Sequence, residues 1–327
     1  MGRCRQAGKK QRAARAGSRL SPRPSRDTLH SMQPPMTSSS PARHEGRIIL
    51  TADDFGWTDG QNLAIERAAQ AGTLTRASLL CNGDAFAGAL LTAQRCPQLE
   101  VGVHLTLCEG RPVGRGVGLS QLLRSDGAFH DGLSPLCQTY LRGQLDVNAI
   151  RDEWRQQIER ALRAGFQLSH LDGHKHVHML PPLQQLAIKL AQEYQVGYVR
   201  TSAEILSRRA LSRAPVWLVL FCLGTYARHH VRAAGLRTCD RFVGLTDSGQ
   251  MTAEKLLGAI QEARKHSGTT EIMLHPAVLT PEMLQLGHRY AWARSYQFEG
   301  ELSALCDPRV IAALKQPPAA TSASLAA

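Results

Sequence analysis

The chain has 327 residues, of which 43% are hydrophobic and 20% are charged, and its formal net charge at pH 7 is +12. These values are ordinary for a globular protein with one large α/β domain or two smaller ones. No stretch approaches the roughly 20 consecutive apolar residues of a membrane-spanning helix. A net charge this high is also typical of nucleic-acid-binding proteins, so its position along the chain has to be considered.

The positive charge is concentrated in residues 1–46. This segment has ten Lys and Arg residues against two acidic ones, so the other 281 residues carry only four of the twelve net charges. It is rich in Arg, Ser and Pro and poor in large apolar residues, which predicts a disordered basic extension. No apolar stretch follows its positive charges, as a secretory signal would require. We therefore expect no nucleic-acid partner, although a tail that binds an acidic surface remains the alternative.

The eight cysteines are scattered and include no CxxC pair. This spacing argues against a zinc ribbon and against a compact disulfide framework. Free thiols in a reducing compartment are the simplest interpretation, so we expect a cytoplasmic protein.

From Arg47 onward, short β-rich runs alternate with helical patterns. In chain order, we expect a strand at 47–55, a helix at 58–72, a strand at 77–82, a helix at 84–96, a strand at 100–107, a loop to about 145, a helix at 146–165, a strand at 167–173, a helix at 181–195, strands at 197–202 and 241–247, a helix at 252–266 and a strand at 270–277. Strands that alternate with helices imply parallel pairing through crossovers. The pattern predicts an α/β fold, with about seven mostly parallel strands in a closed or partly closed barrel. Residues 316–327 are expected to be a disordered tail.

Two nucleotide-binding motifs are missing from the sequence. No G-x-G-x-x-G follows the first strand, and no G-x-x-x-x-G-K-[ST] occurs anywhere. Dinucleotide binding and P-loop phosphate chemistry are therefore not expected.

Polar clusters occur where predicted strands end. Asp53 and Asp54 lie in "TADDFG", His104 ends "VGVH", residues 170–179 read "HLDGHKHVHM", and His275 follows "EIML". The carboxyl ends of parallel barrel strands meet at one face, where active sites are assembled. Two adjacent carboxylates at a buried strand end need a positive partner. A divalent metal bound by one carboxylate and two imidazoles would supply it.

The histidine-rich segment has two interpretations. His174, His176 and His178 alternate, so they share one side of an extended segment, whereas only His174 and His178 share a face of a helix. A single histidine here would usually be structural. Four histidines between residues 170 and 178, beside two acidic strand ends, favour metal ligands.

Together these motifs carry a family resemblance. "TADDFG" followed by "GQN", then "VGVHLTL", then "HLDGHKHVHM", is similar to the YdjC-like carbohydrate deacetylases over roughly residues 47–280. The resemblance implies an irregular (β/α) barrel over residues 47–315, of the kind seen in glycoside hydrolases and deacetylases. It also implies a metal-dependent hydrolase that removes acetyl from an N-acetylated sugar. Only minor departures from the family pattern occur, at Gly173 and Lys175.

The resemblance also implies roles for individual residues. Asp54, His104 and His174 correspond to the ligands of one divalent metal ion, with magnesium and zinc both compatible. Asp53 corresponds to the general base that takes a proton from the attacking water. His275 is our own assignment, either as the acid that protonates the departing amine or as a residue that orients Asp53; a structural histidine is the alternative.

The later half of the chain bears on the substrate. Its motifs are more similar to the hopanoid biosynthesis-associated branch of the family, and residues 215–235 run from apolar to basic. Such a segment is typical of an interfacial helix, with a core helix as the alternative. We expect an N-acetylglucosaminyl hopanoid as substrate and peripheral contact with the inner membrane. A soluble chitooligosaccharide deacetylase is the alternative function.

Three further points stay open at this stage. A metal-independent glycosidase would also place carboxylates at barrel strand ends. A sugar-binding protein without activity would have the same motifs. The oligomeric state is not determined, and a homodimer is compatible with the sequence.

Overall fold

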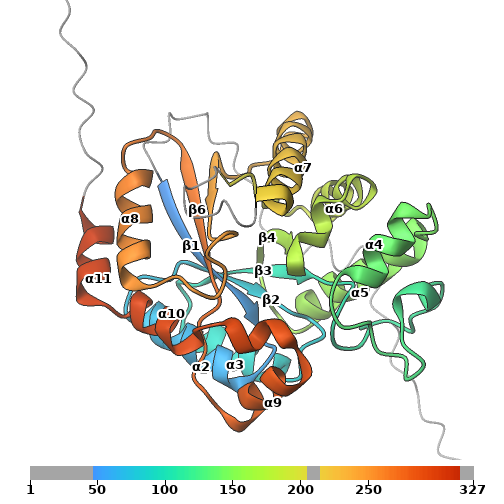
Figure 1. Cartoon of the computed structure of the whole chain (residues 1–327), viewed down its shortest axis with the longest axis horizontal. Coiled ribbons are helices and arrows are strands. Elements are labelled where there is room, and N and C mark those ends of the chain that lie inside the picture. The colour runs from blue at the N-terminus through green and yellow to red at the C-terminus, as the bar shows by residue number, and fades with distance from the viewer. Residues whose placement is uncertain (1–46, 205–213, 317–327) are drawn as a thin grey trace, which may run out of the picture. The chain divides into compact units, whose positions relative to one another are not determined.

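The computed structural model describes residues 47–204 and 214–316 (Figure 1). The expected basic extension at 1–46 and residues 317–327 of the expected tail lie outside the described residues. The strands are β1 (Arg47–Phe55), β2 (Arg76–Leu79), β3 (Glu100–Leu105), β4 (Leu168–Gly173), β5 (Arg241–Val243) and β6 (Thr269–Leu274). The α-helices are α2 (Asp59–Gln70), α3 (Phe86–Arg95), α4 (Ser134–Leu141), α5 (Val147–Arg163), α6 (Pro181–Glu193), α7 (Ala214–Ala233), α8 (Ala253–Ala263), α9 (Pro281–Arg289), α10 (Phe298–Leu305) and α11 (Pro308–Lys315). Short 3-10 turns are η1 (Ser120–Leu122), η2 (His174–Met179) and η4 (Ala291–Ser295).

All strand pairs of the sheet are parallel, as the alternating pattern predicted. The order is β4-β3-β2-β1-β6-β5, so β1 lies between β2 and β6. In Figure 1 the sheet is surrounded by helices, with α2 and α3 on one side, α5 to α7 on another and α8 with α11 on a third. The strands thus converge with their carboxyl ends at one face, where the predicted polar clusters lie.

The expectation of about seven strands is corrected to six in the described part of the chain. The missing one is residues 197–202, which form isolated bridges in place of a ladder. Val199 bridges Leu171 of β4, Tyr198 bridges Arg237, and Glu204, two residues beyond the segment, bridges Phe242 of β5. The segment and the residues that follow it therefore touch both edge strands of the sheet, but each contact extends over a single residue pair, too short to count as a regular strand.

Local sequence accounts for most element boundaries. Thr58 caps α2, since its side chain accepts from the backbone N–H of Gln61 while the Gln61 side chain accepts from the Thr58 N–H. Asp146 caps α5 in the same way, accepting from two backbone N–H groups of the first turn. The expected loop up to residue 145 is wrong in one place, because it contains α4. That helix buries only Leu136 and Thr139, too few positions to give a helical period in the sequence.

The core lies between the sheet and its helices. Its largest fully buried side chains include Trp154 of α5, Phe55 of β1 and Phe242 of β5. All seven cysteines of the described residues are free thiols, as expected from their spacing. Within residues 47–204 and 214–316, no helix has the length and apolar character needed to cross a bilayer.

Candidate metal centre

The end of β1 turns two consecutive carboxylates toward one site. Neighbouring residues of a regular strand point to opposite faces. Here the pairing with β2 shifts register between Ala52 and Phe55, and Asp54 has a φ of 64°. Aspartate tolerates this left-handed conformation better than most residues. As a result both carboxylates approach His104, whose Nε2 lies 3.9 Å from Asp53 Oδ2 and 3.7 Å from Asp54 Oδ1.

Asp54, His104 and His174 meet at this point, as the resemblance implied. Their candidate ligand atoms all lie within 4.8 Å of one another, and Asp54 Oδ1 is 3.0 Å from His174 Nδ1. Two ligands that each lie about 2.1 Å from one ion are separated by about 3.0–3.4 Å at octahedral or tetrahedral angles. Both Asp54 oxygens are buried, and in the described part of the chain the polar group against Oδ1 is His174 Nδ1, a nitrogen that can donate only when it carries a proton. Buried carboxylates are almost always satisfied, so this pair of oxygens fits a divalent cation.

Two further carboxylates orient the imidazoles of the site. Asp172 Oδ1 lies 2.7 Å from His104 Nδ1, and Glu109 Oε2 lies 2.9 Å from His174 Nε2. If each carboxylate accepts the N–H of its histidine, the remaining ring nitrogens present lone pairs to Asp54. This is the usual outer-shell arrangement around metal-binding histidines.

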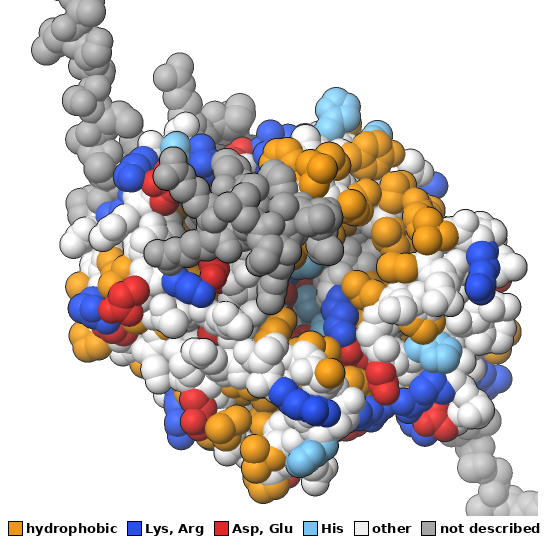
Figure 2. All heavy atoms as spheres, in the orientation of Figure 1, with side chains coloured by type: hydrophobic (Ala, Val, Ile, Leu, Met, Phe, Trp, Pro, Cys, Tyr) orange, Lys and Arg blue, Asp and Glu red, His pale blue; other side chains and the backbone are white. Residues whose placement is uncertain are grey.

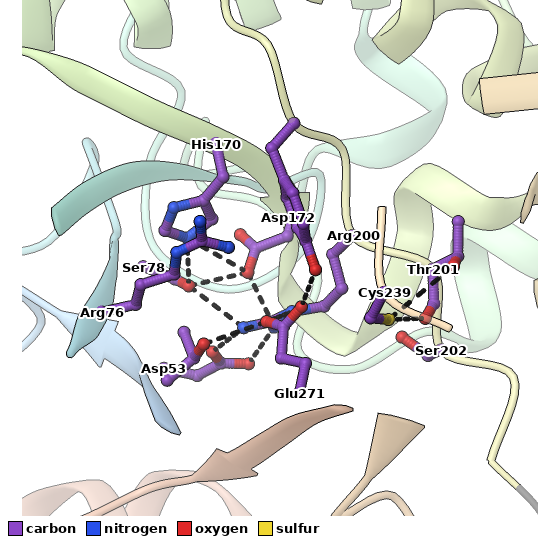
Figure 3. A network of polar contacts seen from close by, with 12 residues as sticks. Asp53, Arg76, Ser78, His170, Asp172, Arg200, Thr201, Ser202, Cys239 and Glu271 are labelled. Carbon is purple, nitrogen blue, oxygen red and sulfur yellow. Dashed lines mark hydrogen bonds and ion pairs between the residues drawn. The ribbon is translucent and has the colours of Figure 1, made fainter. Parts of the chain in front are cut away.

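Arg200 is the positive partner of Asp53 (Figure 3). Its two terminal nitrogens donate to the two Asp53 oxygens at 2.7 and 2.8 Å, and Nη1 also lies 2.7 Å from Asp172 Oδ2. Its Nε donates to Glu271 Oε1 at 2.8 Å. Asp53, His104 and Asp172 form a second group spaced for a metal. Because the Arg200 guanidinium already lies between the two carboxylates of this second group, the Asp54 group is the one that could hold a cation without displacing an arginine.

The charges of the site shift the pKa values of its members. Burial alone would raise the pKa of Asp53, but the nearby Arg200 guanidinium outweighs burial and lowers the pKa to about 2. Burial would likewise raise the pKa of Asp54, and His174 holds it below the ordinary value. Burial acts to lower the pKa of His174, whereas the carboxylates of Asp54 and Glu109 raise it to about 9. A metal ion would have to displace that proton, which couples metal affinity to pH.

A cavity of about 350 Å³ opens above the cluster. Its polar lining includes Asp53, Asp54, His104, His174 and His275. Its apolar and aromatic lining consists of Leu133, Leu220, Leu245, Met273, Trp292 and Tyr296. Figure 2 shows the hollow from outside, with histidine and acidic side chains in its depth and hydrophobic side chains along its rim. This combination of an apolar wall and a few convergent polar groups is typical of a small-molecule site.

The remaining predicted histidines divide into two groups. His275 lines the cavity, and its Nδ1 is buried without a hydrogen bond in residues 47–204 and 214–316. His176 also lines the cavity, with Nδ1 3.0 Å from Ser202 Oγ. His170 and His178 are buried elsewhere, against Ser78 and the Arg200 carbonyl. Only His174 of the histidine-rich segment therefore joins Asp54 and His104.

Three residues of the site were not assigned from sequence. Glu109 lies in the segment expected to be a loop, and Arg200 lies at the end of the segment 197–202 that forms no regular strand. Asp172 lies within the quoted "HLDG" motif. It alternates with His170 and His174, and this spacing was the one sequence signal that it shares their side of the strand. The sequence had suggested His275 as one residue that could orient Asp53. In the structure, Arg200 makes the hydrogen bonds that orient it.

The chain is similar in sequence and in fold to several known proteins. A family model described as YdjC-like protein matches residues 47–316. A carbohydrate deacetylase of Mus musculus is 34% identical over 247 residues, which cover 70% of this chain and 77% of that protein. A carbohydrate deacetylase of Brevibacillus brevis is 30% identical over 253 residues, covering 77% of this chain and 90% of that protein. A crystal structure from Enterococcus faecalis V583, named for cellobiose-phosphate cleavage, matches with a TM-score of 0.62 at 24% identity, covering 82% and 93% of the two chains. At that identity the last likeness is one of fold alone.

Proposed function

The chain belongs to the family of YdjC-like proteins, and from this premise we propose that it is a metal-dependent carbohydrate deacetylase. The reaction is hydrolysis of the acetamide of an N-acetylated sugar to a free amine and acetate. The observation that carries the proposal is the buried cluster of Asp54, His104 and His174 beneath the cavity, whose candidate ligand atoms all lie within 4.8 Å of one another.

The proposed roles follow from the contacts of each residue. A divalent ion held by Asp54, His104 and His174 would acidify a water and polarise the acetyl carbonyl. Asp53 takes the proton of the attacking water. Its pKa of about 2 keeps the carboxylate ionised and therefore able to accept a proton. Arg200 fixes the Asp53 carboxylate through two hydrogen bonds, so the base cannot rotate away from the site.

His275 is our candidate for the acid that protonates the leaving amine. It lines the same cavity as the metal ligands, and its buried Nδ1 has no partner in the described residues. Its backbone N–H donates to Glu301, which holds the residue at the end of β6. Burial outweighs the opposing Asp54 carboxylate and lowers the pKa of the imidazole, so His275 would serve as the acid only after it has received a proton during the reaction.

We propose a lipid-linked sugar, specifically an N-acetylglucosaminyl hopanoid, as the preferred substrate. The apolar part of the cavity wall supports this choice, since Leu133, Leu220 and Leu245 line it beside the polar cluster. A chitooligosaccharide is the second candidate, because the rings of Trp292 and Tyr296 in the same wall suit an additional sugar unit.

Mass spectrometry of both substrates tests the proposal. The metal-loaded protein is incubated with the glycolipid and with N,N'-diacetylchitobiose, and loss of one acetyl group is expected. Asp53→Asn and His174→Ala should abolish the loss, whereas Glu262→Gln, a fully exposed position on α8, should leave it intact. Deacetylation of chitobiose alone would select the second candidate. Cleavage of the glycosidic bond that survives EDTA, or no reaction of either substrate with metal bound, would refute the deacetylase.

A further inference from the structure

The outward face of α7 is an apolar surface next to the cavity. We define the α7 face as Leu218, Val219, Cys222 and Tyr226, all of which are exposed. Leu218 and Val219 are 54% and 58% exposed, which is unusual for large aliphatic side chains next to each other. In Figure 2, hydrophobic side chains gather over α7 and continue toward the hollow.

Packing of the opposite side of α7 determines which face is outward. At Gly224 the helix comes so close to the backbone of Ala203 that an added Cβ would lie 2.5 Å from its nitrogen. Ala227 and Val231, on the same side, are buried, and the Ala227 carbonyl accepts from Gln184 of α6. The α7 face therefore cannot turn inward without breaking these contacts.

The segment that contains the α7 face carries positive and no negative side chains as far as Thr238. From Leu218 to Thr238 the sequence contains three arginines and two histidines and no acidic residue. Arg232 pairs with Asp240, whereas Arg237 is exposed and Arg228, within the described residues, donates to the neutral carbonyl of Ala203. Exposed apolar side chains followed by cations are the features that bind a helix to an anionic lipid surface.

The α7 face also continues into the cavity. Leu220, on the next position of the same helix, is part of the cavity lining, so apolar surface runs from the exposed face to the metal site. We propose that the α7 face docks on an anionic lipid bilayer, so that a membrane-anchored sugar enters the cavity while its lipid stays in the membrane. This inference rests on the proposed function for its substrate but not for the docking itself.

Vesicle co-sedimentation of the full chain tests the docking. Leu218→Glu/Val219→Glu is compared with wild type on vesicles of phosphatidylcholine with phosphatidylglycerol. Both proteins keep the basic residues 1–46. A difference in vesicle binding between them therefore measures the contribution of the α7 face. Binding should weaken at least about tenfold, since two half-exposed aliphatic side chains lose their burial in the bilayer. Leu141→Glu, at an 81% exposed leucine on α4, is the matched control and should bind as wild type does.

A soluble substrate separates this inference from the proposed function. The double variant should deacetylate N,N'-diacetylchitobiose at the wild-type rate, and lose rate only on glycolipid in vesicles. Equal vesicle binding by wild type and the double variant would overturn the docking. So would a wild-type dimer that the double variant dissociates without any change in vesicle binding, because the face would then be covered by a second copy. A lack of turnover of both chitobiose and the glycolipid in every protein would count against the deacetylase and leave the vesicle result intact.

Discussion

The substitution Asp172→Asn tests whether the orientation of His104 matters for metal binding. Asp172 is fully buried and uses both oxygens, with Oδ1 2.7 Å from His104 Nδ1 and Oδ2 accepting from Ser78 at 2.7 Å and lying 2.7 Å from Arg200 Nη1. Asparagine has the same shape but one acceptor oxygen. If its amide nitrogen faces His104, Nδ1 becomes the acceptor and the ring proton moves to Nε2, where the lone pair for the metal is needed. If the amide nitrogen faces Arg200, two donors meet.

The expected loss can be estimated from outer-shell carboxylates in general. Removal of such a partner typically lowers metal affinity about 10- to 100-fold, or about 1.4–2.7 kcal/mol. We expect a value in this range for Asp172→Asn, because His104 keeps its position but loses the preferred tautomer.

Isothermal titration of zinc into metal-stripped protein measures the change. Glu153→Gln is the matched control, since Glu153 is also a buried carboxylate but accepts from the backbone of Val113 and Gly114. Circular dichroism and a cooperative thermal transition must show that both variants fold. A folded Asp172→Asn protein that binds zinc with wild-type affinity would refute the role of Asp172 at the metal centre.

Three other predictions follow from the same structure. Saturating zinc or magnesium should raise the Tm of the wild type, with a stabilisation of about 2.7 kcal/mol at a free metal concentration 100 times Kd. Asp54→Asn should show no such rise in Tm, and a rise that persists in this variant would place the ion elsewhere. The pKa of Asp53 is lowered from 3.8 to about 2 in the folded protein, so its stabilisation is present above pH 4 and is lost as the pH falls toward 2. Urea unfolding should show about 2 kcal/mol of acid destabilisation that Asp53→Asn lacks, and equal acid sensitivity of the two proteins would contradict the assigned ion pair. Trp154→Ala should lower the free energy of unfolding by about 3–5 kcal/mol, because its side chain is fully buried. In Leu141→Ala the change in the free energy of unfolding should stay within about 0.5 kcal/mol. Similar losses of stability in both variants would contradict the burial of Trp154.

Local sequence was sufficient for much of the framework. The run at 47–55 predicted β1 with its observed ends, and the helix expected from residue 58 begins at Asp59 as α2, with Thr58 as its cap. Period, caps and glycines act over a few residues, so they can be recognised without the fold. The parallel α/β pattern also predicted that the polar strand ends would converge at one face, and the family resemblance selected Asp54, His104 and His174 among them; their role as ligands stays a proposal.

Which charges are paired was decided by the tertiary structure alone. Asp53 and Arg200 are 147 residues apart, and their contact depends on a segment that bridges β4 without forming a ladder with it. Two neighbouring aspartates therefore have different partners, an arginine for one and the histidine cluster for the other. The outward direction of the α7 face likewise depends on the close approach at Gly224. Sequence period determines what a segment can become, but the burial and pairing of a charge depend on neighbours that only the folded chain brings together.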